Sequence, residues 1–325
     1  MSNKRLLCLG DANVDIIVPY GEALEQRQSE LAREANIRIT SGGPTANTVC
    51  GLGLLGRDPI YIAKIGNDHF GRLLLNDIAR CGVDSNDVVI DNEHSTMYII
   101  AVLDSSGERT FFLPDGEINA AQNFRPEDVA PDIFDRFDIV HLSGATLIDD
   151  SYMGITTLDF AQKARYKNKT ILFDLNLRIG SNRKLDPAYY KRVHTLLPLA
   201  DHILGSVNEF QIVFEDDNVE SIGSKLAQQG KVAIIRNGVN PVIIHSPTVR
   251  QMIPSAKGPE KIVDTIGAGD NFNSGYMAAL EQGLDMPTCV KWANTAAAYS
   301  LAAAGGKGGP TMAQLRHALK ESYNI

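Results

Sequence analysis

The chain has 325 residues, of which 44% are hydrophobic, enough to bury one large core or two unequal ones. Its formal charge of −8, without long runs of either sign, excludes a strongly basic groove for nucleic acid and gives no basis for binding an anionic membrane. No apolar run approaches the ~20 residues of a membrane span, and the four cysteines lack Cys-x-x-Cys spacing, so we expect a cytoplasmic protein with reduced thiols.

Apolar, β-branched runs alternate with segments of helical periodicity along the chain. Strands are predicted at residues 6–9, 59–65, 139–142, 170–175, 202–204 and 232–236. Helices are predicted at residues 45–55, 70–81, 151–165, 187–199, 268–281, 287–303 and 311–321. This alternation predicts an α/β fold with a doubly wound, mostly parallel sheet flanked by helices on both faces.

Two stretches break the alternation. Residues 14–18 with 37–40, and residues 96–114, have extended patterns with no helix between them. Such patterns are typical of a small antiparallel sheet, built here from segments at about 14–40 and 90–118. Because we find neither a linker nor a repeat, we expect a single domain over residues 1–325.

A glycine-rich turn leads into the helix predicted to begin at residue 268. Its sequence is Asp264-Thr265-Ile266-Gly267-Ala268-Gly269-Asp270-Asn271-Phe272. The N–H groups of residues 266–269 would lie at the positive end of that helix, where glycines let a phosphate approach closely. Asp270 would stand beside the phosphate, placed to take a proton from an attacking hydroxyl. Taken alone, the segment would favour the simpler interpretation, an ordinary strand-to-helix turn capped by an aspartate.

Four other polar segments punctuate the sequence. They are Gly10-Asp11-Ala12-Asn13-Val14-Asp15, Gly42-Gly43-Pro44-Thr45-Ala46-Asn47, Ile65-Gly66-Asn67-Asp68-His69-Phe70-Gly71 and Asp174-Leu175-Asn176-Leu177-Arg178. Ligands of a doubly wound sheet collect outside the carboxyl ends of its strands, so the first, second and fourth segments should converge on the glycine turn. The alternatives are turn residues, a helix start with Pro44 at its first position, and an exposed strand end.

Taken in chain order, these four segments and the glycine turn resemble the motifs of the ribokinase-like (PfkB-type) carbohydrate kinases. The resemblance extends from about residue 6 to residue 310. The resemblance implies a ribokinase-like fold and an ATP-dependent enzyme that phosphorylates a small sugar with the help of Mg²⁺. It also implies that the small sheet is a lid over the sugar, that two lids join in a homodimer, and that K⁺ binds beside the glycine turn.

The resemblance assigns a role to each matching position. Catalysis falls to Asp270 as the base, with Gly267, Ala268 and Gly269 as the anion hole. The sugar is contacted by Asn13, Asp15, Gly42, Gly43, Asn47 and Asp270. The nucleotide is contacted by Asn176, Arg178, Asn208, Arg236, Gly238, Gly267, Gly269 and Asn294. K⁺ maps onto the Asp264 side chain and nearby carbonyls, including that of Thr265.

The sequence departs from the family pattern at two places. In Asn208-Glu209-Phe210-Gln211, a glutamine stands where the family's metal-linked glutamate is usual. Either Glu209 takes over as a Mg²⁺ ligand, or the metal is held more through water and ATP. Around Arg236-Asn237-Gly238, members often carry a threonine and glycines against the nucleotide, and Arg236 would contact phosphate or be a charge at a strand end. The adenine is expected between the segment after Pro254 and the helix that bears Asn294, with residues 305–309 near nucleotide and cation.

The substrate is less tightly specified than the reaction. The Asp-x-Asn-x-Arg segment favours fructokinase-like or ketodeoxygluconate-kinase-like branches, which phosphorylate a primary hydroxyl. One alternative is a nucleoside kinase that stacks a base on Tyr98, Phe111 or Phe112. The other is a catalytically weak sugar-binding regulator, which only Gln211 suggests.

Overall fold

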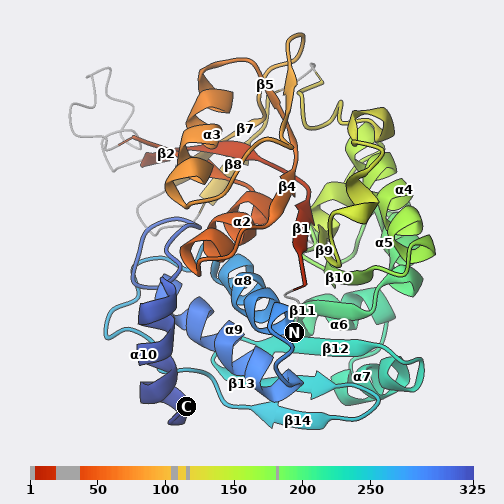
Figure 1. Cartoon of the computed structure of the whole chain (residues 1–325), viewed down its shortest axis with the longest axis vertical. Coiled ribbons are helices and arrows are strands. Elements are labelled where there is room, and N and C mark those ends of the chain that lie inside the picture. Colours follow the sequence, from red (N-terminus) through yellow and green to blue (C-terminus); the bar gives the residue numbers. More distant parts are fainter. Residues whose placement is uncertain (1–3, 20–36, 104–108, 115–117, 181–182) are drawn as a thin grey trace.

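A computed structural model describes residues 4–19, 37–103, 109–114, 118–180 and 183–325. Its largest element is an eight-stranded sheet with the order β14-β13-β12-β11-β10-β9-β1-β4 (Figure 1). The strands are β1 (Leu6–Leu9), β4 (Ile60–Ile62), β9 (Ile139–Ser143), β10 (Thr170–Asp174), β11 (His202–Ser206), β12 (Val232–Asn237), β13 (Asn240–His245) and β14 (Arg250–Ile253). Neighbours from β4 to β12 are parallel, whereas β13 and β14 are antiparallel, so the predicted mostly parallel sheet is confirmed.

Helices cover both faces of this sheet (Figure 1). They are α2 (Pro44–Leu54), α3 (His69–Arg80), α4 (Tyr152–Tyr166), α5 (Pro187–Leu196), α6 (Val207–Phe214), α7 (Val219–Gln228), α8 (Ala268–Glu281), α9 (Met286–Ser300) and α10 (Met312–Tyr323). Short 3₁₀ turns occur at Pro126–Asp128, Ile133–Asp135, Gly144–Leu147 and Leu197–Leu199. Within the described stretches, none of the helices combines the length and the apolar character needed to cross a membrane.

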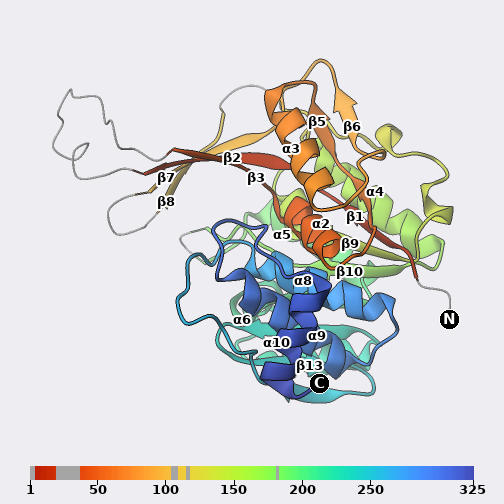
Figure 2. The ribbon, with the colours of Figure 1, turned by 60° about the vertical axis from the view of Figure 1, so that its left-hand side comes forward.

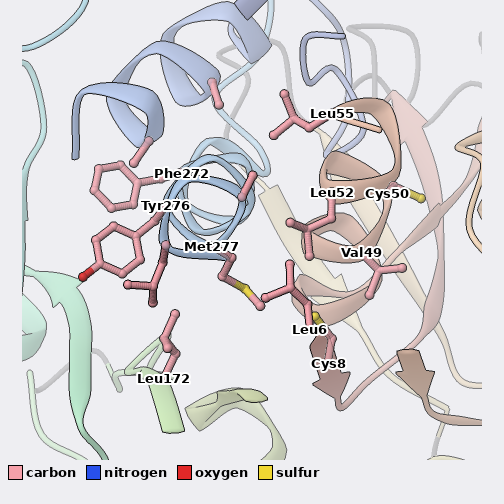
Figure 3. Packing of buried hydrophobic residues seen from close by; sticks show 14 of the residues in the cluster. Leu6, Cys8, Val49, Cys50, Leu52, Leu55, Leu172, Phe272, Tyr276 and Met277 are labelled. Atoms are coloured by element: carbon pink, nitrogen blue, oxygen red, sulfur yellow. The ribbon is translucent and has the colours of Figure 1, made fainter. Parts of the chain in front are cut away.

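Alternate residues of the central strands supply two separate cores. Leu6 and Cys8 of β1 lie in the core shared with α2, α8 and α9, whereas Leu7 and Leu9 lie in the core on the other face. Figure 3 shows Leu6 meeting Leu52 of α2 and Met277 of α8 in the first core. Because β1 is buried on both faces, it is apolar at every position. This packing fixes α8, and therefore its first turn, over the centre of the sheet.

A second, four-stranded sheet projects away from the large one (Figure 2). Its order is β3-β2-β7-β8, with β2 (Asn13–Pro19), β3 (Arg38–Gly42), β7 (Tyr98–Leu103) and β8 (Arg109–Phe112). The expectation that this sheet is wholly antiparallel was wrong, because β2 and β7 pair in parallel. Strands β2 and β7 both run outward from the large sheet, and β3 and β8 run back toward it.

The predicted strand at 59–65 is also corrected. It is two strands in different sheets: β4 pairs with β1, and β5 (Lys64–Gly66) pairs with β6 (Val89–Asp91). Ala63 separates the two strands. The buried ammonium of Lys64 in β5 lies 2.9 Å from Asp128 Oδ2 and 3.4 Å from Asp91 Oδ2 of β6, so the second ion pair joins the two strands of the small sheet.

Candidate active site

The glycine turn opens α8 at the carboxyl ends of the parallel strands. Helix α8 begins at Ala268, as predicted, after Gly267 with φ 73°. This left-handed conformation favours glycine, and a Cβ on Gly267 would also collide with Gly306 Cα. Glycine at position 267 is therefore required both by the backbone conformation and by the contact with Gly306.

Asp270 lies in the first turn of α8 and is buried. Its Oδ2 accepts a hydrogen bond of 2.8 Å from Asn47 Nδ2 of α2, which joins two positions 223 residues apart. Burial raises the pKa of Asp270 to about 7, partly offset by the Asn47 hydrogen bond. A carboxyl group that changes protonation near neutral pH is suited to general base catalysis.

The predicted sugar-contact residues come together next to Asn47. Asn13 Nδ2 donates to Asp15 Oδ1 at 2.7 Å, and the backbone of Asn13 pairs with that of Gly42. A Cβ on Gly42 would collide with Asp15 Oδ2. Gly43 has φ 98° and lies against Asn13 and Asp11 O. Gly43 O accepts a 2.9 Å hydrogen bond from Asn47 N, so these residues form a connected group that reaches Asp270 through Asn47.

Residues 305–309 pack against the glycine turn. Asn271 Nδ2 donates to the carbonyls of Gly267 and Gly306, at 2.9 Å each. Asp264 joins the same two loops, because its Oδ1 accepts from Ile266 N and its Oδ2 accepts from Gly305 N, both at 3.0 Å. Asp264 therefore joins the start of the glycine turn to residues 305–309.

Three residues form a polar cluster that is directly behind the turn. Arg236 Nη2, at the end of β12, lies 2.7 Å from Asp174 Oδ1 at the end of β10. Asp174 Oδ2 accepts a 2.8 Å hydrogen bond from Asn273 Nδ2 of α8. Neither Asp174 nor Asn273 was predicted to be a site residue. The available signal was the group of four polar residues within 270–274, at the start of a helix that is otherwise mostly apolar.

Asn176 and Arg178 differ from their predicted setting. Strand β10 ends at Asp174, so the two residues lie in a loop rather than alternating along a strand. Asn176 has φ 36°, and its Oδ1 accepts a 2.8 Å hydrogen bond from the exposed Arg178 guanidinium. Asn208 Oδ1 accepts a 2.6 Å hydrogen bond from Arg183 in the same loop region. Two arginines therefore border this side of the site.

Both carboxylate oxygens of Glu209 accept hydrogen bonds from backbone N–H groups. Its Oε1 accepts from Leu177 N at 2.7 Å and its Oε2 accepts from Ser206 N at 2.6 Å, which makes it the capping-box residue of α6. Gln211 donates to Asp217 O at 2.9 Å. Across the described ranges, no three His, Cys, Asp or Glu side chains are grouped so that they could hold a metal. These residues do not fit a Mg²⁺ ion bound directly by side chains.

The two remaining nucleotide positions are farther from Asp270 along the sheet. Asn294 Nδ2 donates to Pro254 O at 3.0 Å and to Tyr323 Oη at 3.2 Å, so α9 does border the segment at Pro254. Gly238, with φ 60°, forms the turn between β12 and β13. A Cβ at position 238 would meet nothing within 4 Å, so glycine is favoured there by the positive φ alone and not by close packing.

A glycine turn at a helix N-terminus with a buried carboxyl in the helix's first turn is the arrangement expected of an enzyme that transfers a phosphoryl group to a hydroxyl. Residues 3–311 match the pfkB family of carbohydrate kinases, and the chain belongs to that family. The expectation of an ATP-dependent carbohydrate kinase is therefore confirmed.

Individual relatives are distant. The chain is 27% identical to the ATP-dependent ribose-1-phosphate kinase of Halopiger xanaduensis, over 98% of this chain and 99% of that one. It is 28% identical to a fructokinase of Klebsiella pneumoniae, over 86% of this chain and 85% of that one. The structure resembles a putative ribokinase II from E. coli with a TM-score of 0.83, 20% identity and coverage of 98% and 99%. This last likeness confirms the ribokinase-like fold.

Proposed function

We propose that the enzyme phosphorylates a primary hydroxyl of a small sugar or sugar derivative of the fructokinase-like or ketodeoxygluconate-kinase-like type. The observation that carries the proposal is the contact between Asp270 and Asn47. It brings the predicted base, at the phosphate turn, within one hydrogen bond of the predicted sugar residues. We further propose that residues 1–325 act as one domain, with the small sheet as a lid.

Each part of the site has a task in this reaction. Asn13, Asp15 and Asn47 would hold sugar hydroxyls, with Gly42 and Gly43 allowing close approach. Asp270 would accept the hydroxyl proton while the sugar oxygen forms the new bond to phosphorus and the ADP oxygen leaves. The N–H groups of residues 267–269 would receive the negative charge that spreads over the phosphoryl oxygens.

We expect Mg²⁺ and K⁺ to be bound in different ways. Because both Glu209 oxygens are taken by backbone donors, we propose that Mg²⁺ is held by ATP and water rather than by Glu209. Both Asp264 oxygens are likewise taken by backbone donors, so of the two predicted K⁺ ligands we propose the Thr265 carbonyl rather than the Asp264 side chain. Among the described residues, Thr265 O accepts a long hydrogen bond of 3.4 Å from Ala268 N, which leaves capacity for a cation.

The lid offers two faces with different chemistry. Asp15 pairs with Thr40, and Ile17 pairs with Arg38, so Arg38 shares the face that bears Asp15. Arg38 is exposed and has no acidic partner among the described residues. An anionic group on the sugar, a carboxylate or a phosphate, would be met there, which makes anionic sugars a second substrate class to test.

The opposite face of the lid carries an apolar row. Ile39, Ile16, Ile100 and Phe112 are successive cross-strand partners, and the two ends of the row are 52% and 53% exposed. We propose that this row is the homodimer contact. Tyr98 lies on the same face and packs against Phe70 with ring centroids 5.6 Å apart, so it is turned away from Asp15. The nucleoside alternative therefore gains no support from Tyr98 or Phe112, and the Phe111 side chain lies outside the described residues.

The experiment is a substrate panel. ADP release from ATP and Mg²⁺ would be measured with ketoses, aldoses, sugar acids, sugar phosphates and nucleosides, with and without K⁺. We expect one sugar class to stimulate ADP release at least 100-fold over ATP alone. A response to nucleosides only would replace the sugar proposal, and no response from any compound would favour the regulator.

A further inference from the structure

A buried ion pair lies behind the glycine turn and takes no part in the chemistry proposed above. The Arg236 and Asp174 side chains are 17% and 2% exposed, with Nη2 and Oδ1 2.7 Å apart. Arg236 Nη1 donates to the carbonyl of Gly269 at 3.3 Å and to Asn273 Oδ1 at 3.4 Å. Glu209 Oε2 lies 3.7 Å from Nη2. The two terminal guanidinium nitrogens therefore point into the protein.

The contact with Gly269 acts on Asp270 through one peptide bond. The carbonyl of Gly269 belongs to the same planar peptide unit as the N–H of Asp270. A guanidinium that fixes this carbonyl also fixes the N–H vector and the start of the Asp270 side chain. Gly269 leaves room for it, since a Cβ there would lie only 3.2 Å from Arg236 Nη1.

We infer that Arg236 and Asp174 form a charge-balanced pair that positions Asp270, with Arg236 anchoring the Gly269 peptide and Asp174 neutralising Arg236. The inference rests on the proposed role of Asp270 as the base. It assigns Arg236 to positioning, in place of the direct phosphate contact suggested by the sequence.

The charges around Asp270 indicate how the ion pair would affect its pKa. The groups that act on Asp270 from its neighbouring elements are Asp11 after β1, Asn47 on α2, Asp174 on β10 and Arg236 on β12. His141 of β9 lies beside the cluster, with Nε2 3.5 Å from Asn273 Nδ2. His141 is neutral, because burial lowers its pKa to about 4. After burial itself and the Asn47 hydrogen bond, Asp174 and Asp11 raise the pKa of Asp270, and Arg236 lowers it. The two halves of the pair thus act on Asp270 in opposite directions.

The test is kcat/KM against pH for four proteins: the parent, Arg236→Met, Asp174→Asn and the double variant. Removal of the cation leaves Asp174 uncompensated, so the acid limb of Arg236→Met should move up by about one pH unit. Asp174→Asn leaves the cation, so its limb should move down by about one unit. The double variant should return near the parent, with a lower kcat because the Gly269 anchor is lost.

Arg236→Lys serves as the matched control. It keeps the charge but loses the fork that reaches both Asp174 and Gly269, so its limb should stay near that of the parent while kcat falls. Circular dichroism and thermal melting of all variants would establish that each is folded. If one single variant does not fold, the other still tests the inference, because its limb must move in the direction given above while that of Arg236→Lys stays near the parent.

Three results would overturn the inference. Limbs that stay fixed, or that move in the same direction, in both single variants would show a merely structural pair. A higher KM for ATP in Arg236→Met with a fixed limb would restore Arg236 as a phosphate ligand.

If the parent phosphorylates nothing, the proposed function fails, and the pair is then tested without turnover. The aspartate carboxyl ¹³C resonances are titrated, with Asp270→Asn as the assignment control. Opposite shifts of the Asp270 midpoint would support the inference, and equal midpoints would overturn it.

Discussion

An ionised Asp270 carboxylate, as a base requires, is expected to cost folding stability because the side chain is buried. Burial raises its pKa from 3.8 to about 7 in the folded protein. Between these values the unfolded chain releases the proton while the folded protein keeps it, so the stability contributed by the protonated carboxyl is lost as pH rises. Asp270→Asn should therefore be about as stable as the parent at pH 4 and more stable at pH 8, by on the order of 2–4 kcal/mol.

Urea unfolding at the two pH values measures this difference directly. A difference in the free energy of unfolding that is the same at pH 4 and pH 8 would show that the carboxyl titrates normally in the folded protein. In that case burial would not be setting the protonation of the base.

Gly306 controls the contact between Asn47 and Asp270. A Cβ at this position would collide with the Asn47 amide, while a Cβ on Gly258 would meet nothing within 4 Å. Gly306→Ala should displace Asn47 and lower kcat/KM for the sugar by roughly 10- to 100-fold, since small displacements in an active site are costly. Steady-state kinetics of Gly306→Ala and of the control Gly258→Ala would decide, and equal loss in both would refute the packing argument.

The individual site residues divide by how far apart in sequence their partners lie. The glycine turn could be predicted from a local motif, and so could the pair Asn13 and Asp15, because the residues of each lie close together in the sequence. The contact of Arg236 with Asp174, 62 residues apart, could not be predicted, because it depends on the order β10-β11-β12 in the sheet. The same holds for Glu209, whose second partner is Leu177 N.

Among the elements, the buried parallel strands and most of the helices were predicted, whereas α6, α7 and the antiparallel strands β13 and β14 were not. Helix α8 has the predicted bounds because a glycine turn starts it and buried apolar residues follow at helical spacing. Helix α6 has eight residues, and Pro241 near the start of β13 is atypical of a strand, so neither was predicted. In both cases tertiary pairing outweighs a weak local pattern.

Helix α8 is held over the sheet by close contact with α9 at Gly275. A Cβ on Gly275 would lie 2.7 Å from Trp292 O and 2.9 Å from Ala293 Cα. Gly275→Ala should push the helices apart and lower the free energy of unfolding by ~1–3 kcal/mol, as overpacking does. Thermal and urea denaturation check this prediction. Unchanged stability would mean that the interface between α8 and α9 is loose enough to absorb a methyl group.

For the whole molecule, the apolar row on the lid should determine association. Ile39→Lys with Phe112→Lys places charge at both exposed ends of the row and should convert a dimer into a monomer in size-exclusion chromatography with light scattering. Tyr166→Lys is the matched control, because Tyr166 is 85% exposed at the end of α4. A parent that is monomeric at every concentration, or a double variant that remains dimeric, would contradict the proposed contact.

The central claim is that Asp270 removes the proton from the sugar hydroxyl during phosphoryl transfer. The most direct measurement is single-turnover transfer of the γ-phosphoryl group of radiolabelled ATP by the parent and by Asp270→Asn, with sugar affinity measured by calorimetry. We expect the transfer rate to fall by about 10²–10⁴-fold while the sugar still binds with similar affinity. A rate within a fewfold of the parent at saturating sugar would show that another group takes the proton.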